Sequence, residues 1–153
     1  GSGGSGLGAR AFSVLRDFAR QYDVIEYVMF HPPVPHSKVP EFIAMSDICI
    51  VPLPDLPQWR NQCPLKLLEY LAMNKPIIAT DIPANRNVLG ANKCVIYVRT
   101  ANPNEIAKAI AYAYENRKML KEWASCGRAI VEEKYSWTKV AGNLEAYLYS
   151  LWS

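Results

Sequence analysis

The chain has 153 residues, of which half are apolar and a fifth are charged, and this composition is typical of one globular domain rather than a disordered or fibrous chain. A formal net charge of +3, with no dense run of Lys and Arg, argues against a nucleic-acid partner. The longest apolar runs have the length of strands, so no membrane span is predicted. The four cysteines show no CxxC pair and no histidines at metal-ligand spacing, so we expect reduced thiols, no metal site and a cytoplasmic protein.

The first six residues, GSGGSG, have the composition of a flexible linker, and we exclude residues 1–6 from the fold prediction. Apolar side chains at helical spacing predict a helix over 9–20, and the β-rich run over 24–30 predicts a strand. A proline-rich turn over 31–35 ends that strand. A short helix is expected over 39–45.

Three more strands are predicted over 47–51, 76–80 and 93–98, with helices between them. The nearly continuous apolar run over 47–51 is typical of a strand that is buried on both faces. A helix over 64–73 separates the first two of these strands. Strands that alternate with helices predict an α/β fold with a parallel sheet, in which ligands bind beyond the carboxyl ends of the strands.

The C-terminal part of the chain is predicted to be helical. Asn102, Pro103 and Glu105 supply a capping residue, a proline at the first helical position and an acidic residue in the first turn, which together are a strong helix start. A second helix is predicted over 120–132, and an apolar stripe predicts a terminal helix. We therefore expect a domain over 7–135 and a C-terminal helix over 136–153.

The helix that starts at Pro64 carries a candidate site for a nucleoside diphosphate. Its first-turn amides are unpaired and partly positive, which suits a phosphate, and Lys66 adds a full charge there. Glu69 lies one turn later on the same side, where a carboxylate can accept hydrogen bonds from both ribose hydroxyls. The spacing is equally compatible with a solvated ion pair between Lys66 and Glu69.

The segment 64–72 (PLKLLEYLA), followed by 75–80 (KPIIAT), resembles the signature of the retaining glycosyltransferases that include sucrose, trehalose and glycogen synthases and many bacterial mannosyl- and glucosyltransferases. Residues 46–52 (SDICIVP) are similar to the strand of that family that ends in proline. Residues 127–128 (GR) and 135–137 (YSW) are similar to its C-terminal pattern. The resemblance implies a Rossmann-like fold that forms the donor-binding half of a two-domain enzyme, which transfers a hexose from a nucleotide sugar with retention.

Two glutamates that flank seven residues bind the donor in that family, the second at the ribose and the first at the transferred sugar. Glu69 matches the second, whereas Asn61 stands at the position of the first and keeps the capacity for hydrogen bonds without the charge. No catalytic side chain, metal or cofactor is expected in this chain besides the donor substrate. The resemblance implies a nucleotide site at Pro64, Leu65, Lys66 and Glu69, and sugar contacts at Asn61, Gln62 and Cys63.

The turn at His31 and Pro32 is a candidate for the nucleobase pocket, because it follows the end of a predicted strand and could form one side of such a pocket. A loop histidine is more often structural or solvated than functional, so this role competes with a simple turn.

The family's donor domain begins with a strand, a helix and another strand, and an acceptor domain precedes it. Neither is found before Leu7, so we expect the 153-residue chain alone to bind poorly and to catalyse nothing. Residues 24–30 are then expected either to pair with 47–51 directly or to borrow strands from another copy in a strand-exchanged oligomer. The intact enzyme is expected in the cytoplasm, with the inner face of the membrane as a further location.

Two other classes of protein share features with this sequence. A signalling receiver domain is also a small parallel α/β unit, but it needs its acceptor aspartate at the carboxyl end of a strand and its lysine after a strand. Asp47 opens a predicted strand and Lys75 precedes one, so these positions do not fit. A non-catalytic nucleotide-binding or interaction module, or an engineered fragment, stays open as the alternative function.

Overall fold

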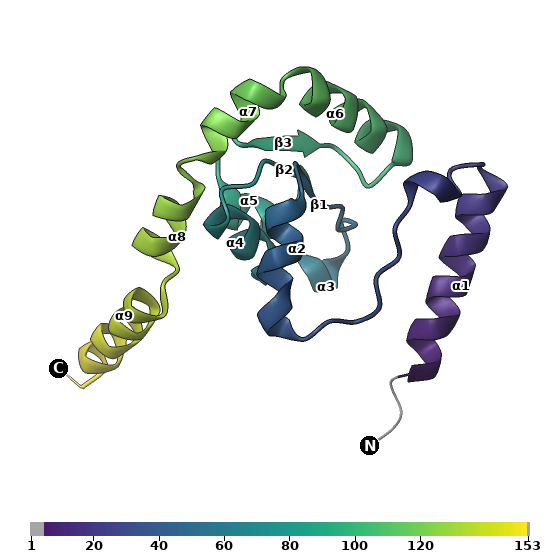
Figure 1. Ribbon diagram of the computed structural model, residues 1–153. Coiled ribbons are helices and arrows are strands. Elements are labelled where there is room, and N and C mark those ends of the chain that lie inside the picture. The colour runs from purple at the N-terminus through teal and green to yellow at the C-terminus, as the bar shows by residue number, and fades with distance from the viewer. Residues whose placement is uncertain (1–4, 153) are drawn as a thin grey trace. The chain divides into compact units, whose positions relative to one another are not determined.

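The computed structural model describes residues 5–152, and their contacts divide the chain into two compact units between Ser37 and Lys38. The first unit contains helix α1 (Ser5–Gln21) and the short 3-10 helix η1 (Ile25–Tyr27). The second unit contains the sheet and the helices that flank it (Figure 1). The expected division into 1–6, 7–135 and 136–153 rests on sequence pattern rather than on contacts, and it stays a prediction.

Helix α1 ends in a Schellman motif, in which one residue in the left-handed region closes the last turn. Asp23 has φ 53°, and its N–H donates to Arg20 O at 3.0 Å while the N–H of Val24 donates to Ala19 O at 2.9 Å. An aspartate tolerates this conformation better than most residues do. The helix therefore stops at a local signal and does not need a contact from elsewhere in the chain.

The predicted strand over 24–30 is not a strand in the structure, and this prediction was wrong. The N–H of Tyr27 donates to Val24 O at 3.0 Å, which is the local bond of a 3-10 turn rather than a bond to a neighbouring strand. The side chains of Tyr27 and Met29 are 85% and 83% exposed. A strand needs a partner to satisfy its backbone groups, and within residues 5–152 no strand pairs with this segment, so its β-rich composition does not decide its conformation.

The sheet of the second unit has three parallel strands in the order β1 (Cys49–Val51), β2 (Ile77–Thr80) and β3 (Val95–Val98). Cys49 pairs with Ile77, and Ile77 pairs with Val95. The strands predicted over 47–51, 76–80 and 93–98 are confirmed as one parallel sheet, with each strand shorter at its amino end. All three strands therefore point their carboxyl ends to the same edge.

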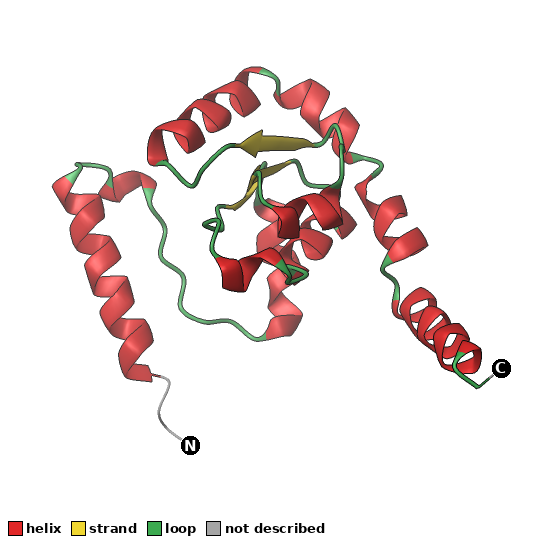
Figure 2. Cartoon of the chain, turned by 180° about the vertical axis from the view of Figure 1, so that it is seen from behind, coloured by secondary structure: helices red, strands yellow, loops and turns green. Residues whose placement is uncertain are grey.

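Helices cover both faces of this sheet (Figure 2). On one face Ile77 packs in the buried cluster that contains Leu71 of α4 (Leu65–Ala72), and on the other face Ile78 packs in the cluster that contains Ala109 of α6 (Pro103–Glu115). Successive residues of β2 thus point to opposite faces of the sheet and pack in different cores, as the two-residue period of a strand requires. The helices of the second unit are α2 (Val39–Met45), α3 (Pro57–Arg60), α4 (Leu65–Ala72), α5 (Pro83–Leu89), α6 (Pro103–Glu115), α7 (Arg117–Ala124), α8 (Gly127–Lys134) and α9 (Trp137–Ser150).

The single helix predicted over 120–132 is two helices, α7 and α8, and this prediction was wrong. The break allows α8 to reach α4, because Gly127 lies so close to Leu71 that a Cβ on Gly127 would be 2.7 Å from Leu71 O. Helix α7 packs on α6, whereas α8 packs on α4. The predicted helix start at Asn102 is confirmed, since its side chain accepts a hydrogen bond from the N–H of Asn104 at 2.8 Å.

Helix α4 ends in a second Schellman motif, which also joins it to α8. Asn74 has φ 52°, its N–H donates to Leu71 O at 2.9 Å, and the N–H of Lys75 donates to Tyr70 O at 3.0 Å. The side-chain carbonyl of Asn74 accepts from the N–H of Arg128 at 3.0 Å. The end of α4 and the start of α8 are therefore held together by a hydrogen bond as well as by the close approach at Gly127.

Candidate functional site

The N-terminus of α4 is reached from the carboxyl end of β1 through the loop and the short helix α3. Pro64 is the N-cap residue with φ −70° and ψ 103°, and no side chain caps the helix there. Leu65 and Lys66 occupy the first two helical positions, where backbone N–H groups have no partner within an α-helix. Both side chains are exposed. This end of α4 therefore presents donors and positive potential that suit an anion.

Glu69 lies one turn after Lys66 and is half-buried. Burial raises the pKa of the hydroxyl of the next residue, Tyr70, and electrostatic interactions with Cys49 and Glu69 raise it further. The sequence prediction that Lys66 and Glu69 share one side of the helix agrees with their positions in α4. Their assignment to a nucleotide stays a prediction, as does the alternative ion pair.

Asn61, Gln62 and Cys63 form the segment that links α3 to α4. Asn61 is the C-cap of α3 and is exposed, Gln62 is half-buried, and Cys63 is an exposed free thiol. These three residues lie between α3 and Pro64, the N-cap residue of α4. Their contact with a sugar stays a prediction.

The loop before this segment is braced by an ion pair that the sequence pattern did not reveal. Arg60 donates two hydrogen bonds to the carboxylate of Asp55, at 2.8 and 2.9 Å. The hydrogen bond from Arg60 holds the pKa of Asp55 below its usual value. Both side chains are exposed, so the pair contributes little to global stability, but it fixes the shape of α3 next to Asn61.

Thr80 ends β2, and its side chain connects the loop after β1 with the start of α5. Its hydroxyl donates to Leu53 O at 2.7 Å and accepts from the side-chain amide of Asn85 at 3.1 Å, which also donates to Thr80 O at 2.8 Å. Thr80 is 1% exposed and Asn85 is 0% exposed. Among the described residues, Asn85 Oδ1 is the buried side-chain atom without a hydrogen-bond partner. These bonds hold two loops of the carboxyl edge in one arrangement.

We expect Thr80→Val to lower the free energy of unfolding by about 1–3 kcal/mol. Valine has nearly the same shape, but it removes the donor to Leu53 O and one acceptor of Asn85, so buried polar groups lose their partners. Urea denaturation of both proteins measures the difference. Thr138→Val on the exposed α9 is the matched control and should change stability by less than about 0.5 kcal/mol. Equal losses in the two variants would show that the Thr80 hydrogen bonds do not stabilise the carboxyl edge.

A second ion pair lies just beyond β2. Arg86 donates to the carboxylate of Asp81 at 2.6 and 2.8 Å, and its guanidinium carbon lies 3.6 Å from the centre of the Tyr97 ring. The hydrogen bond from Arg86 lowers the pKa of Asp81. The Tyr97 hydroxyl donates to Gly90 O at 2.7 Å. The exposed cation of Arg86 is therefore held in a fixed position after the carboxyl end of β2.

His31 and Pro32 are exposed residues of the first unit. The prediction of a nucleobase pocket depends on a strand that ends just before this turn, and residues 24–30 do not form that strand. The topological argument for them is therefore lost, and a role in a nucleobase pocket stays a prediction. Among residues 5–152 no group of three His, Cys, Asp or Glu side chains is placed to hold a metal ion. None of the helices described is long and apolar enough to cross a membrane.

The parallel sheet covered by helices on both faces defines a Rossmann-like α/β fold. Sucrose-phosphate synthase from Thermosynechococcus elongatus shares this fold, with a TM-score of 0.78 and 17% identity over 90% of this chain and 33% of the synthase chain. The chain belongs to the family described as glycosyl transferases group 1, whose family model matches residues 6–129. This confirms the family that the sequence signature predicted.

A curated relative agrees with this assignment. The D-inositol 3-phosphate glycosyltransferase of Nocardia farcinica (strain IFM 10152) is 25% identical over 152 residues, which are 98% of this chain and 32% of the relative. The chain thus spans about a third of the length of the relatives that it matches over nearly its whole length.

Proposed function

We propose that this chain carries the donor site of a retaining glycosyltransferase, which transfers a hexose from a nucleoside diphosphate sugar to an acceptor. The observation that supports this most is the uncapped N-terminus of α4 beyond the carboxyl end of β1, with Lys66 and Glu69 one turn apart on that helix. Ligands of parallel α/β folds bind at this edge of the sheet. The acceptor and the complete activity belong to the intact enzyme.

The chemistry of the donor explains why these groups suit it. Cleavage of the bond between the sugar and the diphosphate leaves negative charge on the diphosphate, and fixed donors stabilise that charge without reorganising. The amides of Leu65 and Lys66 and the Lys66 ammonium supply such donors, and Glu69 accepts from the ribose hydroxyls. Asn61, Gln62 and Cys63 then lie beside the hexose. No step in this account requires a metal or a catalytic side chain from this chain.

Alkylation of Cys63 tests the proposal on the 153-residue chain itself. Cys63 and Cys126 are exposed, whereas burial raises the pKa of Cys49 and of Cys94 to about 11 and keeps these two thiols protonated near pH 7.5. Only the exposed pair should therefore react quickly with iodoacetamide, and mass spectrometry separates the two sites. We expect millimolar UDP-, GDP- or ADP-hexose, whichever is the donor, to slow the labelling of Cys63.

Cys126 is the internal control, because it begins the turn into α8 and is not part of the proposed site. Its labelling rate should be the same with and without each nucleotide sugar. If none of the three changes the rate at Cys63, or if the rates at both thiols fall together, the chain does not hold a donor next to Cys63 and the proposal fails.

A further inference from the structure

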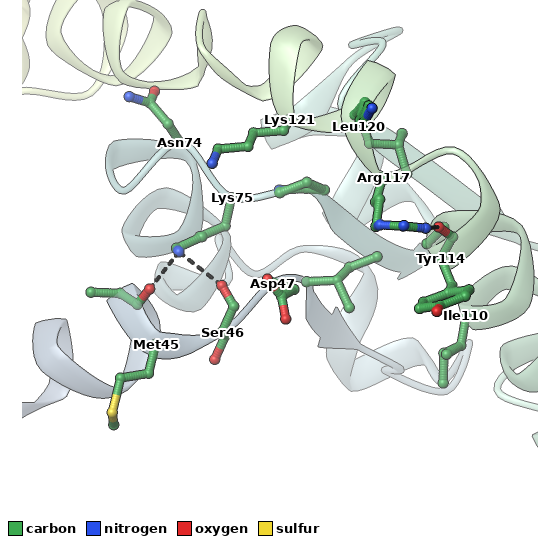
Figure 3. Close-up of a pocket in the computed structure, with 15 residues that line it drawn as sticks. Met45, Ser46, Asp47, Asn74, Lys75, Ile110, Tyr114, Arg117, Leu120 and Lys121 are labelled. Carbon is green, nitrogen blue, oxygen red and sulfur yellow. Dashed lines mark hydrogen bonds between the residues drawn. The ribbon is translucent and has the colours of Figure 1, made fainter.

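A pocket of about 810 Å³ opens at the other edge of the sheet, among residues that precede the strands (Figure 3). Its lining includes Asp47, which precedes β1, and Lys75, which precedes β2, together with residues of α6 and α7. Because the strands are parallel, their amino ends share one edge, and α4 begins beyond the opposite edge. We call this the amino-edge pocket, and the proposed donor site does not include it.

The lining of the amino-edge pocket is strongly basic. Lys75, Arg117, Lys118 and Lys121 line it, and Asp47 is the acidic residue among the lining groups. Arg117, Lys118 and Lys121 lie within one short segment of the sequence, and the fold brings the distant Lys75 to the same pocket. A concave surface with one sign of charge concentrates counter-ions of the opposite sign.

Two of these cations are held in place, and two are not. Lys75 Nζ donates to Ala44 O at 2.7 Å and to Ser46 O at 2.8 Å, and an ammonium group has a third N–H to offer. Arg117 donates to the carbonyl of Tyr114 at 2.9 Å. Within the part of the chain that the structure describes, the ammonium groups of Lys118 and Lys121 have neither an ion pair nor a hydrogen bond.

Positive charge is concentrated at the start of α7. Arg117 and Lys118 begin it, although the N-terminus of a helix favours negative charge, and its first turn has no acidic residue. Lys121 lies three and four residues after them, so these like charges share one side of the helix, and Glu122, four residues after Lys118, offsets part of their repulsion. Asn116, the N-cap residue, makes no side-chain capping hydrogen bond. A bound anion would offset the positive charge at the start of α7.

We propose that the amino-edge pocket binds a soluble small molecule with phosphate groups, separately from the donor. Its volume lies in the range of small-molecule sites, which is about 300–1,000 Å³. The ligand's phosphates contact the side chains of Lys118 and Lys121 and the backbone amides at the start of α7. Lys75 lines the same pocket. A ligand in this pocket contacts α6, α7 and the segment before β1 at the same time.

Calorimetric titration with inorganic pyrophosphate tests this proposal. All proteins carry Lys66→Ala, so that anion binding at the start of α4 is weakened and the two sites are separated. We expect Lys118→Glu to weaken pyrophosphate binding at least tenfold and to leave the melting temperature of the unliganded protein within about 4 °C. An acidic residue suits the start of α7, but it also faces Glu122 four residues later, so these two effects on stability oppose each other. A retained melting transition excludes misfolding as the cause of lost binding.

Two variants serve as controls for the titration. Lys139→Glu makes the same charge change on α9 outside the pocket and should leave the affinity within about twofold, since exposed charges beyond a Debye length are screened. Asp47→Asn removes the acidic lining group and should tighten binding. The proposal is overturned if Lys118→Glu and Lys139→Glu lose affinity equally. It is also overturned if pyrophosphate does not bind while vesicles of phosphatidylcholine and phosphatidylglycerol bind through Lys118, because the partner is then a lipid surface.

Discussion

Glu69→Ala is expected to abolish measurable binding of the nucleotide sugar that protects Cys63. The proposed carboxylate accepts two hydrogen bonds from the ribose, and bonds to a charged group contribute about 1.5–3 kcal/mol each as an upper guide. Loss of both lowers the affinity by about a hundredfold or more, since about 1.4 kcal/mol is a factor of ten. Titration calorimetry on the chain, and on the protein extended to the length of its relatives, measures the change.

The controls for Glu69→Ala distinguish the ribose contact from a helix ion pair. Lys66→Ala should weaken binding less, because the amides of α4 still meet the diphosphate. Glu133→Ala makes the same substitution at an exposed position of α8 and should leave the affinity unchanged. Unchanged nucleotide affinity in Glu69→Ala would show that Glu69 serves the ion pair with Lys66 and not the ribose.

Gly127→Ala is expected to lower the free energy of unfolding by about 1–3 kcal/mol, the usual cost of forcing extra atoms into a packed interface. The added Cβ would lie 2.7 Å from Leu71 O and 3.3 Å from Leu71 C and Cα. These are backbone atoms, so no rotation of a side chain relieves the clash and α8 must move away from α4. For a chain of this size each kcal/mol corresponds to about 2–4 °C in melting temperature, which calorimetry resolves.

Gly142→Ala is the matched control for Gly127→Ala. Gly142 lies inside α9, and a Cβ there has nothing within 4 Å. Alanine has the higher helix propensity, so this substitution should stabilise the protein by about 0.5–1 kcal/mol. The two variants are thus predicted to change stability in opposite directions. A stable Gly127→Ala protein would contradict the close packing of α8 on α4.

Local signals in the sequence determined where several elements begin. Pro64 at the start of α4 and the cap at Asn102 act within one turn of their own helix, so both were predicted and both are present. The apolar runs that became β1, β2 and β3 were also predicted, because a strand buried on both faces needs apolar residues throughout. The same segment around Pro64 identified the family and the candidate donor residues.

Only the tertiary structure decided the features that depend on a distant neighbour. Within residues 5–152 no strand pairs with the β-rich run 24–30, so it is not a strand, and the helix predicted over 120–132 is divided into α7 and α8, of which α8 packs closely on α4 at Gly127. Large apolar side chains of α9 that resemble a core stripe are exposed, and Trp152 after it is 91% exposed.

The hydrogen bonds of Thr80 and the charge of the amino-edge pocket have the same origin. Thr80 reaches Leu53, and Lys75 lines one pocket with Lys118 and Lys121, because the crossovers of the parallel sheet bring these residues together. Periodicity and capping describe a residue's own element, and they carry no information about which other element will lie against it. The sequence by itself therefore determined the family, the strands of the sheet and the start of α4, while the packing of the helices decided the amino-edge pocket.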